Sequence, residues 1–341
     1  MSLGRFESLP VVDLGYGDTP LEPLPQLSKA NRGAQIWAKR DDAQALAFGG
    51  NKVRQVGYYM GAAQAQCADT VLITGAVQSN YCRTAAAFAA KLGMKCHIQQ
   101  EARVASEHPG YKTSGNVLVS QLLGAALSSY PHGEDEAGAD AELERLAETY
   151  RKLGRRPYVV HLGPGHPPIG ALGYVACAKE LLGQINALNL SFDHIAVPSG
   201  SGATHAGFLF GLRALGCKIP VTGYCVRRAE ELQKPRLIAR CAEIAELLEI
   251  ANPVADDDVV INDRFLLPGY GQLNLPTERA ISLSARSEAL ILDPVYSGKC
   301  MAGALNIAGN LRPDQNVLFL HTGGSPAIFA YQMPLSGGFV T

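Results

Sequence analysis

One lysine occupies an unusual place in the sequence. Lys52 follows Gly49-Gly50-Asn51 and lies at the start of the run KVRQVGYYMG, which is predicted to be helical. A helix macrodipole favours anions at its N-terminus, so helix stability does not explain a lysine there. An amine beside the positive end of a helix has a lowered pKa, which makes it available as a nucleophile for Schiff-base formation. The alternative is an ordinary solvated surface lysine.

A glycine-rich segment predicts a phosphate site. Residues 199–207 read SGSGATHAG and join a strand-like run to a helical run. Free backbone N–H groups at a helix start bind phosphate, but the segment lacks the Walker A and the full dinucleotide patterns, so the phosphate would not belong to ATP or NAD. A tight turn without a ligand explains the segment equally well. The candidate residues are Ser199, Gly200, Ser201, Gly202, Ala203 and Thr204.

A second strand-to-helix junction, TGAVQSNYCR, places Gln78, Ser79 and Asn80 at a predicted helix start. Ser and Asn are favoured N-caps, so capping alone explains either residue. A substrate carboxylate would also fit, because it would meet helix N–H groups and the Ser79 hydroxyl together. Two tyrosines in glycine-flanked loops, Tyr270 and Tyr296, are further candidates, although each could be a packed aromatic. Together, these sites would suit a phosphorylated cofactor that handles an amino acid.

The elements that position these residues alternate along the chain. Short β-branched runs such as TVLITG and KCHIQQ are separated by longer amphipathic runs, which predicts βαβ units and a parallel sheet. Ligands bind at the carboxyl ends of the strands in such sheets. Further strand-like runs end in glycine-containing loops there, namely PYVVHL, DHIAVPSG, PVTGYCV, LILDPVYSG and NVLFLHTGG. We therefore expect a two-domain α/β protein with a cleft between the domains.

The amino-acid composition indicates which kind of molecule the protein binds. The 341 residues are 47% hydrophobic, and 30 basic against 31 acidic residues give a formal charge of −1. Without a basic stripe, a small zwitterionic ligand is expected instead of nucleic acid or a membrane. The chain shows no apolar run of transmembrane length and no secretory pattern, so a cytoplasmic location is expected. Eight cysteines without CxxC or paired Cys/His spacing predict reduced thiols and no metal site.

Seven motifs, in this order, resemble those of the pyridoxal-phosphate enzymes of the D-cysteine desulfhydrase and 1-aminocyclopropane-1-carboxylate deaminase family. They are KRDDAQALAFGGNKVR, GAVQSNYCR, GALGY, SGSGATHAG, PGYG, LDPVYSGKCMAG and LFLHTGG. The resemblance implies fold type II, an α/β architecture similar to that of the tryptophan synthase β subunit, with open, mostly parallel sheets and helices on both faces. It also implies a large cofactor-binding domain (1–50 and 163–341), a small α/β domain (51–162) and a homodimer.

The resemblance also implies roles for the cofactor-binding residues. Lys52 would form the Schiff base with pyridoxal 5'-phosphate, and Asn80 would hydrogen-bond the ring hydroxyl. The segment 199–204 would hold the phosphate. Tyr296 would lie against the pyridine ring, and Thr322 would lie near the pyridine nitrogen.

Other motif positions are implied to contact the substrate. Ser79 would hold the substrate carboxylate, and Gln78, Asn80 and Tyr81 belong to the same substrate loop. Tyr270 and Tyr296 would flank the substrate, and either could give a proton to the departing group. The freed Lys52 would be the base for the Cα proton.

Two positions depart from the deaminase pattern. Ser297 stands where deaminases have Glu, and Thr322 stands where they have Leu. A neutral hydroxyl near the pyridine nitrogen would leave the ring unprotonated and a weaker electron sink than a carboxylate would. That suits elimination of a good leaving group from Cβ better than ring-opening deamination.

Three further departures lie near the expected substrate cleft. Tyr81 replaces a histidine, GPGHPP (163–168) replaces a GGSN-type loop, and QLNLPTERA follows PGYG. His166 in the second of these is either a donor for a sulfonate or a solvent-facing loop histidine.

The expected activity is β-elimination on a small amino acid, with D-cysteine giving pyruvate, hydrogen sulfide and ammonia. The alternatives are L-cysteate losing sulfite, or another carbon–sulfur lyase reaction, and 1-aminocyclopropane-1-carboxylate deamination. A further alternative is a protein that binds pyridoxal phosphate but does not catalyse a reaction.

Overall fold

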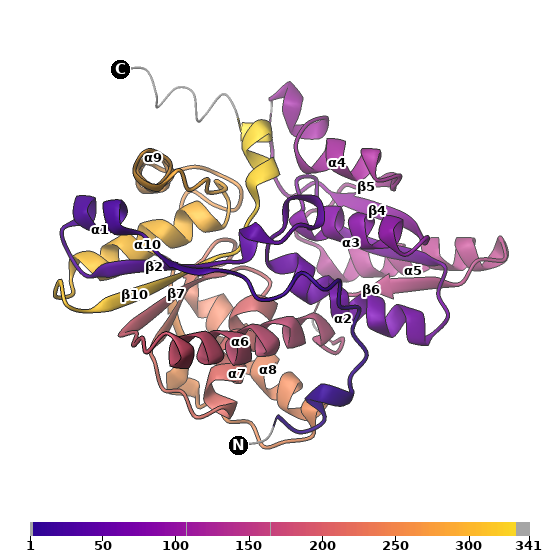
Figure 1. Ribbon diagram of the computed structural model, residues 1–341. Coiled ribbons are helices and arrows are strands. Elements are labelled where there is room, and N and C mark those ends of the chain that lie inside the picture. Colours follow the sequence, from indigo (N-terminus) through magenta and orange to yellow (C-terminus); the bar gives the residue numbers. More distant parts are fainter. Residues whose placement is uncertain (1–2, 107, 164, 332–341) are drawn as a thin grey trace.

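The computed structural model describes residues 3–106, 108–163 and 165–331 (Figure 1). Their strands form two sheets. The larger sheet has the order β1-β2-β10-β7-β8-β9, and only β1 is antiparallel to its neighbour among these described strands. Its strands are β1 (Leu21–Pro23), β2 (Gln35–Arg40), β10 (Asn316–His321), β7 (His194–Ser199), β8 (Val221–Cys225) and β9 (Val260–Asn262).

Helices cover both faces of the larger sheet (Figure 1). In β10, Leu318 and Leu320 face one hydrophobic cluster, while Val317 and Phe319 face the other. This strand is therefore apolar on both sides, as parallel strands buried between helices usually are. The first cluster includes α6 (Leu172–Ala187), α7 (Ala203–Ala214) and α8 (Glu230–Leu248), and the second includes α1 (Pro25–Asn31), α9 (Leu275–Glu288) and α10 (Ser297–Gly309).

The smaller sheet is wholly parallel, with the order β5-β4-β3-β6. It consists of β5 (Ala126–Tyr130), β4 (Lys95–Glu101), β3 (Thr70–Ala76) and β6 (Pro157–Val160). Val71 and Ile73 of β3 pack with α2 (Asn51–Ala65) and α3 (Asn80–Lys91), whereas Leu72 packs with α5 (Glu136–Lys152). A short helix, α4 (Asn116–Leu122), lies beside α3.

The two sheets confirm the predicted mixed α/β architecture with mostly parallel strands. The α2 helix contacts α3 on one side, and α6 and the 3-10 turn Ile169–Ala171 on the other. The helix that carries Lys52 therefore joins both parts of the molecule. The exact domain boundaries, 1–50 with 163–341 and 51–162, stay a prediction.

A buried ion-pair network fixes α2 to the larger sheet. Arg54 of α2 donates to Glu180 Oε2 at 2.6 Å and to Asp41 Oδ1 at 3.0 Å. Glu180 also accepts from Lys39 of β2, whose side chain is fully buried. Because a buried charge is costly unless it is paired, these groups depend on one another.

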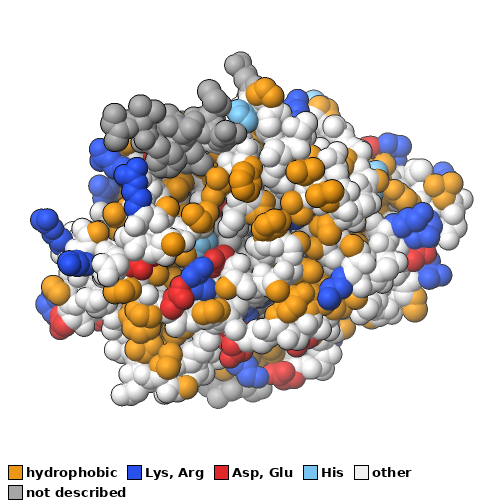
Figure 2. Space-filling view, turned by 45° about the horizontal axis from the view of Figure 1, so that its top comes forward, with side chains coloured by type: hydrophobic (Ala, Val, Ile, Leu, Met, Phe, Trp, Pro, Cys, Tyr) orange, Lys and Arg blue, Asp and Glu red, His pale blue; other side chains and the backbone are white. Residues whose placement is uncertain are grey.

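The surface carries charges of both signs. Figure 2 shows acidic, basic and hydrophobic side chains interspersed on one face, in line with the formal net charge of −1. Within the described residues, every helix is too short or too polar to cross a bilayer.

Candidate active site

The start of α2 is held against the end of β10 by a glycine. Gly50 has a φ of +102°, and a Cβ on it would lie 2.8 Å from the Thr322 carbonyl oxygen. Only glycine adopts this conformation without strain and allows this close approach. The backbone N–H of Asn51 donates to that same carbonyl at 3.0 Å. The Gly-Gly-Asn sequence thus places Lys52 next to Thr322.

The Lys52 amine lies at an open cleft, which residues at the starts of α2, α3 and α7 line together. Its Nζ donates to Gln55 Oε1 at 3.2 Å and lies 4.6 Å from the ring centroid of Tyr81. In the described part of the chain it has no carboxylate partner, and burial lowers the pKa of Lys52 to about 7. A large fraction of this amine is therefore neutral at physiological pH.

The segment between β7 and α7 has the geometry of an anion site. Gly200, Ser201, Gly202 and Thr204 line the cleft. The backbone N–H groups of the three residues 200–202 donate to no other described residue. Gly202 adopts a φ of +103° immediately before α7. Unpaired N–H groups at a helix N-terminus suit a phosphate, so the segment fits the phosphate group of pyridoxal phosphate.

Hydrogen bonds join this segment to both sides of Lys52. Thr204 Oγ1 accepts from Asn51 Nδ2 at 2.8 Å and from Gln55 Nε2 at 2.6 Å. All three polar groups are buried. The amine and the anion site are therefore held at a fixed separation.

Ser79 and Asn80 line the opposite side of the cleft, at the start of α3. The Ser79 hydroxyl caps the helix by accepting from the Cys82 N–H at 3.2 Å. Asn80 Oδ1 accepts from Asn116 Nδ2 at 2.9 Å, whereas Asn80 Nδ2 donates to no residue that the structure describes. That amide can therefore donate to a ligand such as the ring hydroxyl of the cofactor.

Tyr270 and Tyr296 form a hydroxyl pair in the cleft. Their Oη atoms lie 2.8 Å apart, and their rings meet edge to face. Burial raises the pKa of Tyr270 and raises that of Tyr296 further. Both hydroxyls therefore stay protonated near neutral pH and can donate hydrogen bonds to a ligand.

Two of the site residues predicted from the sequence, Gln78 and Ser199, do not line the cleft. Gln78 donates to the carbonyl of Tyr111 at 2.6 Å, and its Oε1 accepts from the Asn116 N–H at 2.9 Å. Ser199 Oγ accepts from Gln233 Nε2 at 3.0 Å. Both side chains thus make hydrogen bonds to neighbouring protein segments. Neither is among the described residues that line the cleft. Ala203 contributes the first residue of α7 and lines a smaller neighbouring cavity.

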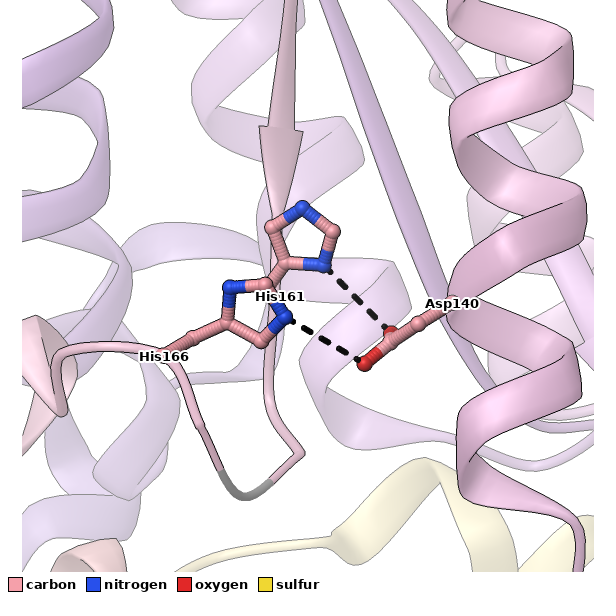
Figure 3. A group of neighbouring side chains, drawn as sticks. All are labelled: Asp140, His161 and His166. Carbon is pink, nitrogen blue, oxygen red and sulfur yellow. Dashed lines mark ion pairs between the residues drawn. The ribbon is translucent and has the colours of Figure 1, made fainter.

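His166 lies beside His161 and Asp140 (Figure 3). Its ring stacks on His161, with centroids 3.8 Å apart, and its Nε2 lies 3.8 Å from Asp140 Oδ2. His166 is outside the described lining of the cleft, so the structure gives no support to the alternative that it is a sulfonate donor.

The two positions that depart from the deaminase pattern differ in placement. Thr322 lines the cleft beside Gly50. Ser297 is buried, and its hydroxyl donates to Asp293 Oδ1 at 2.6 Å at the start of α10. Only Thr322 can therefore act directly on a ligand.

Sequence analysis missed a group of charged residues in the cleft. Glu136 of α5 accepts from Arg227 at 2.7 Å, from Arg236 at 3.2 Å and from Arg228. These arginines hold the pKa of Glu136 down at about 2. Arg103, which pairs with Glu101, also lines the cleft. The position of Arg227 just after β8 was an available signal, because ligands bind at strand ends.

Comparison with known proteins decides the family. Residues 12–323 match the family model described as "Pyridoxal-phosphate dependent enzyme". The chain belongs to this family. The cofactor of this family fits the cleft described above, and the resemblance inferred from the seven motifs is confirmed.

The curated relatives cover nearly the whole chain. A 1-aminocyclopropane-1-carboxylate deaminase of Burkholderia vietnamiensis is 39% identical over 97% of this chain and 98% of its own. One of a Bradyrhizobium strain is 38% identical over 99% of this chain and all of its own. The pyridoxal-phosphate enzyme described here therefore belongs within the deaminase and desulfhydrase group.

Solved structures agree on the fold. An ACC deaminase homologue has a TM-score of 0.86 and 32% identity, covering 99% of both chains. O-ureido-L-serine synthase has a TM-score of 0.67 at 16% identity, covering 97% of this chain and 96% of its own, and so supports the fold alone. The expected fold type II architecture is thus confirmed.

Proposed function

We propose that this enzyme catalyses β-elimination on a small amino acid with a good leaving group at Cβ, with D-cysteine as the substrate. The observation that carries the proposal is Thr322, a neutral hydroxyl that lines the cleft beside the start of α2. Near the pyridine nitrogen it would leave the ring unprotonated, which favours expulsion of a leaving group over a long-lived carbanion.

The residues of the cleft supply the remaining functions. Bound pyridoxal phosphate supplies an electron sink for the charge that develops at Cα. The Ser79 hydroxyl and the N-terminus of α3 hold the substrate carboxylate, and the neutral Lys52 amine accepts the Cα proton. Tyr270 or Tyr296 donates a proton to the departing sulfur. D-cysteine and one water molecule then give pyruvate, hydrogen sulfide and ammonia.

The curated relatives favour a second candidate. Because they are named 1-aminocyclopropane-1-carboxylate deaminase, ring-opening deamination to 2-oxobutanoate and ammonia is the rival reaction. L-Cysteate, with release of sulfite, is a further substrate of the same elimination, and binding of the cofactor without turnover is the non-catalytic rival.

Product analysis separates these reactions. The holoenzyme is incubated with D-cysteine, L-cysteine, L-cysteate or 1-aminocyclopropane-1-carboxylate, and sulfide, sulfite, pyruvate and 2-oxobutanoate are assayed. We expect equal amounts of sulfide and pyruvate from D-cysteine, with kcat/KM at least about tenfold above that for any other substrate, which is 1.4 kcal/mol of discrimination. Faster formation of 2-oxobutanoate would instead establish the deaminase reaction, and no product from any of the four would favour a binding protein.

Capture of the cofactor should follow the titration of Lys52. Only the neutral amine attacks the aldehyde, and a pKa of about 7 raises its fraction from about one tenth at pH 6 to about nine tenths at pH 8. The rate at which cofactor-free protein binds pyridoxal phosphate should therefore rise about tenfold between pH 6 and pH 8 and then level off. Stopped-flow absorbance measures this rate, and Nα-acetyl-lysine controls for titration of the cofactor itself. A rate that still rises tenfold per pH unit above pH 8 would indicate an ordinary lysine.

Replacement of Ser79 by alanine should affect both binding and stability. Loss of the hydroxyl is expected to raise KM about tenfold, and loss of the N-cap should lower the free energy of unfolding by about 1 kcal/mol. Ser79→Asn is the matched control, because asparagine caps a helix equally well but displaces the hydroxyl. It should restore stability while KM stays high. A normal KM in Ser79→Asn would assign Ser79 to capping alone.

Two expectations about the molecule as a whole are part of the proposal. We propose that the enzyme is a homodimer and that it acts in the cytoplasm on a free amino acid. Light scattering of the purified holoenzyme tests the first, with twice the mass of the chain as the expected result.

A further inference from the structure

Three side chains outside the proposed reaction converge at the edge of the cleft. Asp140 projects from α5, and His161 and His166 flank the segment after β6 (Figure 3). One ligand atom from each lies within 4.8 Å of the others. The sequence predicted no metal site because it lacks paired spacing, but these ligands come from separate elements.

The distances within the group are unusual for hydrogen bonds. His161 Nδ1 lies 3.5 Å from Asp140 Oδ1, and His166 Nε2 lies 3.8 Å from Asp140 Oδ2. Good N–H···O hydrogen bonds are about 2.7–3.2 Å long. Ligand atoms that share a tetrahedral zinc ion lie about 3.3 Å apart, given bonds of about 2.0–2.1 Å. A small contraction would bring the three groups to ligand spacing.

His161 has one ring nitrogen held by a carboxylate and the other without a hydrogen-bond partner among the described residues. Its Nε2 lies 2.9 Å from Glu144 Oε1, whereas its Nδ1 is buried and has no hydrogen-bond partner among the described residues. A carboxylate on one nitrogen of a histidine places the proton there and leaves the other nitrogen free to bind a metal. Asp140 and Glu144 raise the pKa of His161, so a proton competes with a metal for Nδ1.

His166 can complete the set. Its backbone carbonyl accepts from Arg240 at 3.2 Å, which holds the backbone at His166. The two rings are parallel, so each must turn about its Cβ–Cγ bond before both lone pairs meet at one ion. The His166 side chain is 40% exposed and has room to turn.

We propose that Asp140, His161 and His166 bind one zinc ion. Two imidazoles and a carboxylate form a ligand set that Zn²⁺ binds, with the fourth position open to water. Asp140 and Gly163 also line the cleft, and a Cβ on Gly163 would lie 2.9 Å from Asp140 Oδ2. Zinc would therefore fix His161 and His166 to α5 at the cleft edge, whichever amino acid the enzyme accepts.

Zinc binding to the metal-stripped holoenzyme tests this proposal. The exposed thiol of Cys67 also attracts zinc, so all variants are made in a Cys67→Ser background. Competition with a chromophoric chelator at pH 8 should give one zinc per chain. The affinity should fall at least about tenfold in His161→Gln and in His166→Gln, and about tenfold in Glu144→Gln. His132→Gln, which changes an exposed histidine of the same part of the chain, should leave it unchanged.

A second measurement identifies the ligands directly. Cobalt(II) in the same site should give the visible absorption of a four-coordinate ion, and the His161→Gln/His166→Gln double variant should lose it. The spectrum of the bound cofactor and circular dichroism check the fold of each variant, and the more exposed His166 variant carries the test if His161→Gln does not fold. Unchanged zinc affinity in the double variant, or no zinc bound at about 100 μM, would refute the site.

Discussion

Replacement of Lys52 by alanine is expected to lower kcat by roughly 10³-fold, because a positioned general base contributes about 10²–10⁴-fold. The folded state should survive. The amine donates to Gln55 and otherwise lies over the ring of Tyr81, and burial lowers its pKa, so folding gains little from this charge. The absorption of the bound cofactor should also change, because the side chain proposed to bind its aldehyde is lost.

Steady-state kinetics and absorbance spectra check this expectation with two controls. Lys179→Ala removes an exposed lysine and should leave kcat unchanged. Added methylamine should partly restore turnover of Lys52→Ala, which a purely structural role for the lysine would not allow. If Lys52→Ala keeps the spectrum of the wild type and more than about one tenth of its kcat, the assignment of Lys52 is wrong.

The largest expected effect on stability comes from Glu180. Its replacement by alanine would leave Lys39 fully buried and Arg54 nearly so, each without this carboxylate. Breaking a buried pair by removing one partner costs about 3–5 kcal/mol, so the free energy of unfolding should fall by about that amount. Asp41 still pairs with Arg54, whereas Lys39 keeps hydrogen bonds only to the uncharged acceptors Thr19 O and Gln184 Oε1.

Urea unfolding followed by fluorescence measures the effect. Trp37, the single tryptophan of the chain, lies in β2 two residues before Lys39 and therefore reports on the larger sheet. Glu7→Ala is the matched control, because Glu7 forms an exposed pair with Lys179 and should change stability by less than about 1 kcal/mol. A similarly small loss in Glu180→Ala would mean that water enters the network and screens its charges.

The sequence was most informative where a parallel sheet dictates position. Lys52, Ser79, Gly200 and Thr322 all follow predicted strands or open predicted helices, and such ends meet at one edge of a sheet. Their common cleft could therefore be anticipated from local patterns and from the motif resemblance. The two sheets followed from the same alternation of β-branched and amphipathic runs.

The direction in which a side chain points was harder to predict from the sequence, because it depends on segments that are distant along the chain. Gln78 belongs to the same motif as Ser79, yet it turns towards the carbonyl of Tyr111, 33 residues further along the chain. Glu136 meets Arg227 and Arg236, which follow it by 91 and 100 residues. No local pattern contains either contact, since each exists only after the two parts of the chain pack together.

The hydrogen bonds of Asn51 and Gln55 to Thr204 bear on the length of ligand that the cleft accepts. Both amides are anchored to the threonine that opens the anion site, and they lie on either side of Lys52. Protein hydrogen bonds therefore set the distance from the Lys52 amine to the anion site before any ligand binds. We therefore expect the cleft to bind an aldehyde whose anionic group matches this distance more tightly than one whose anionic group lies one bond nearer or farther.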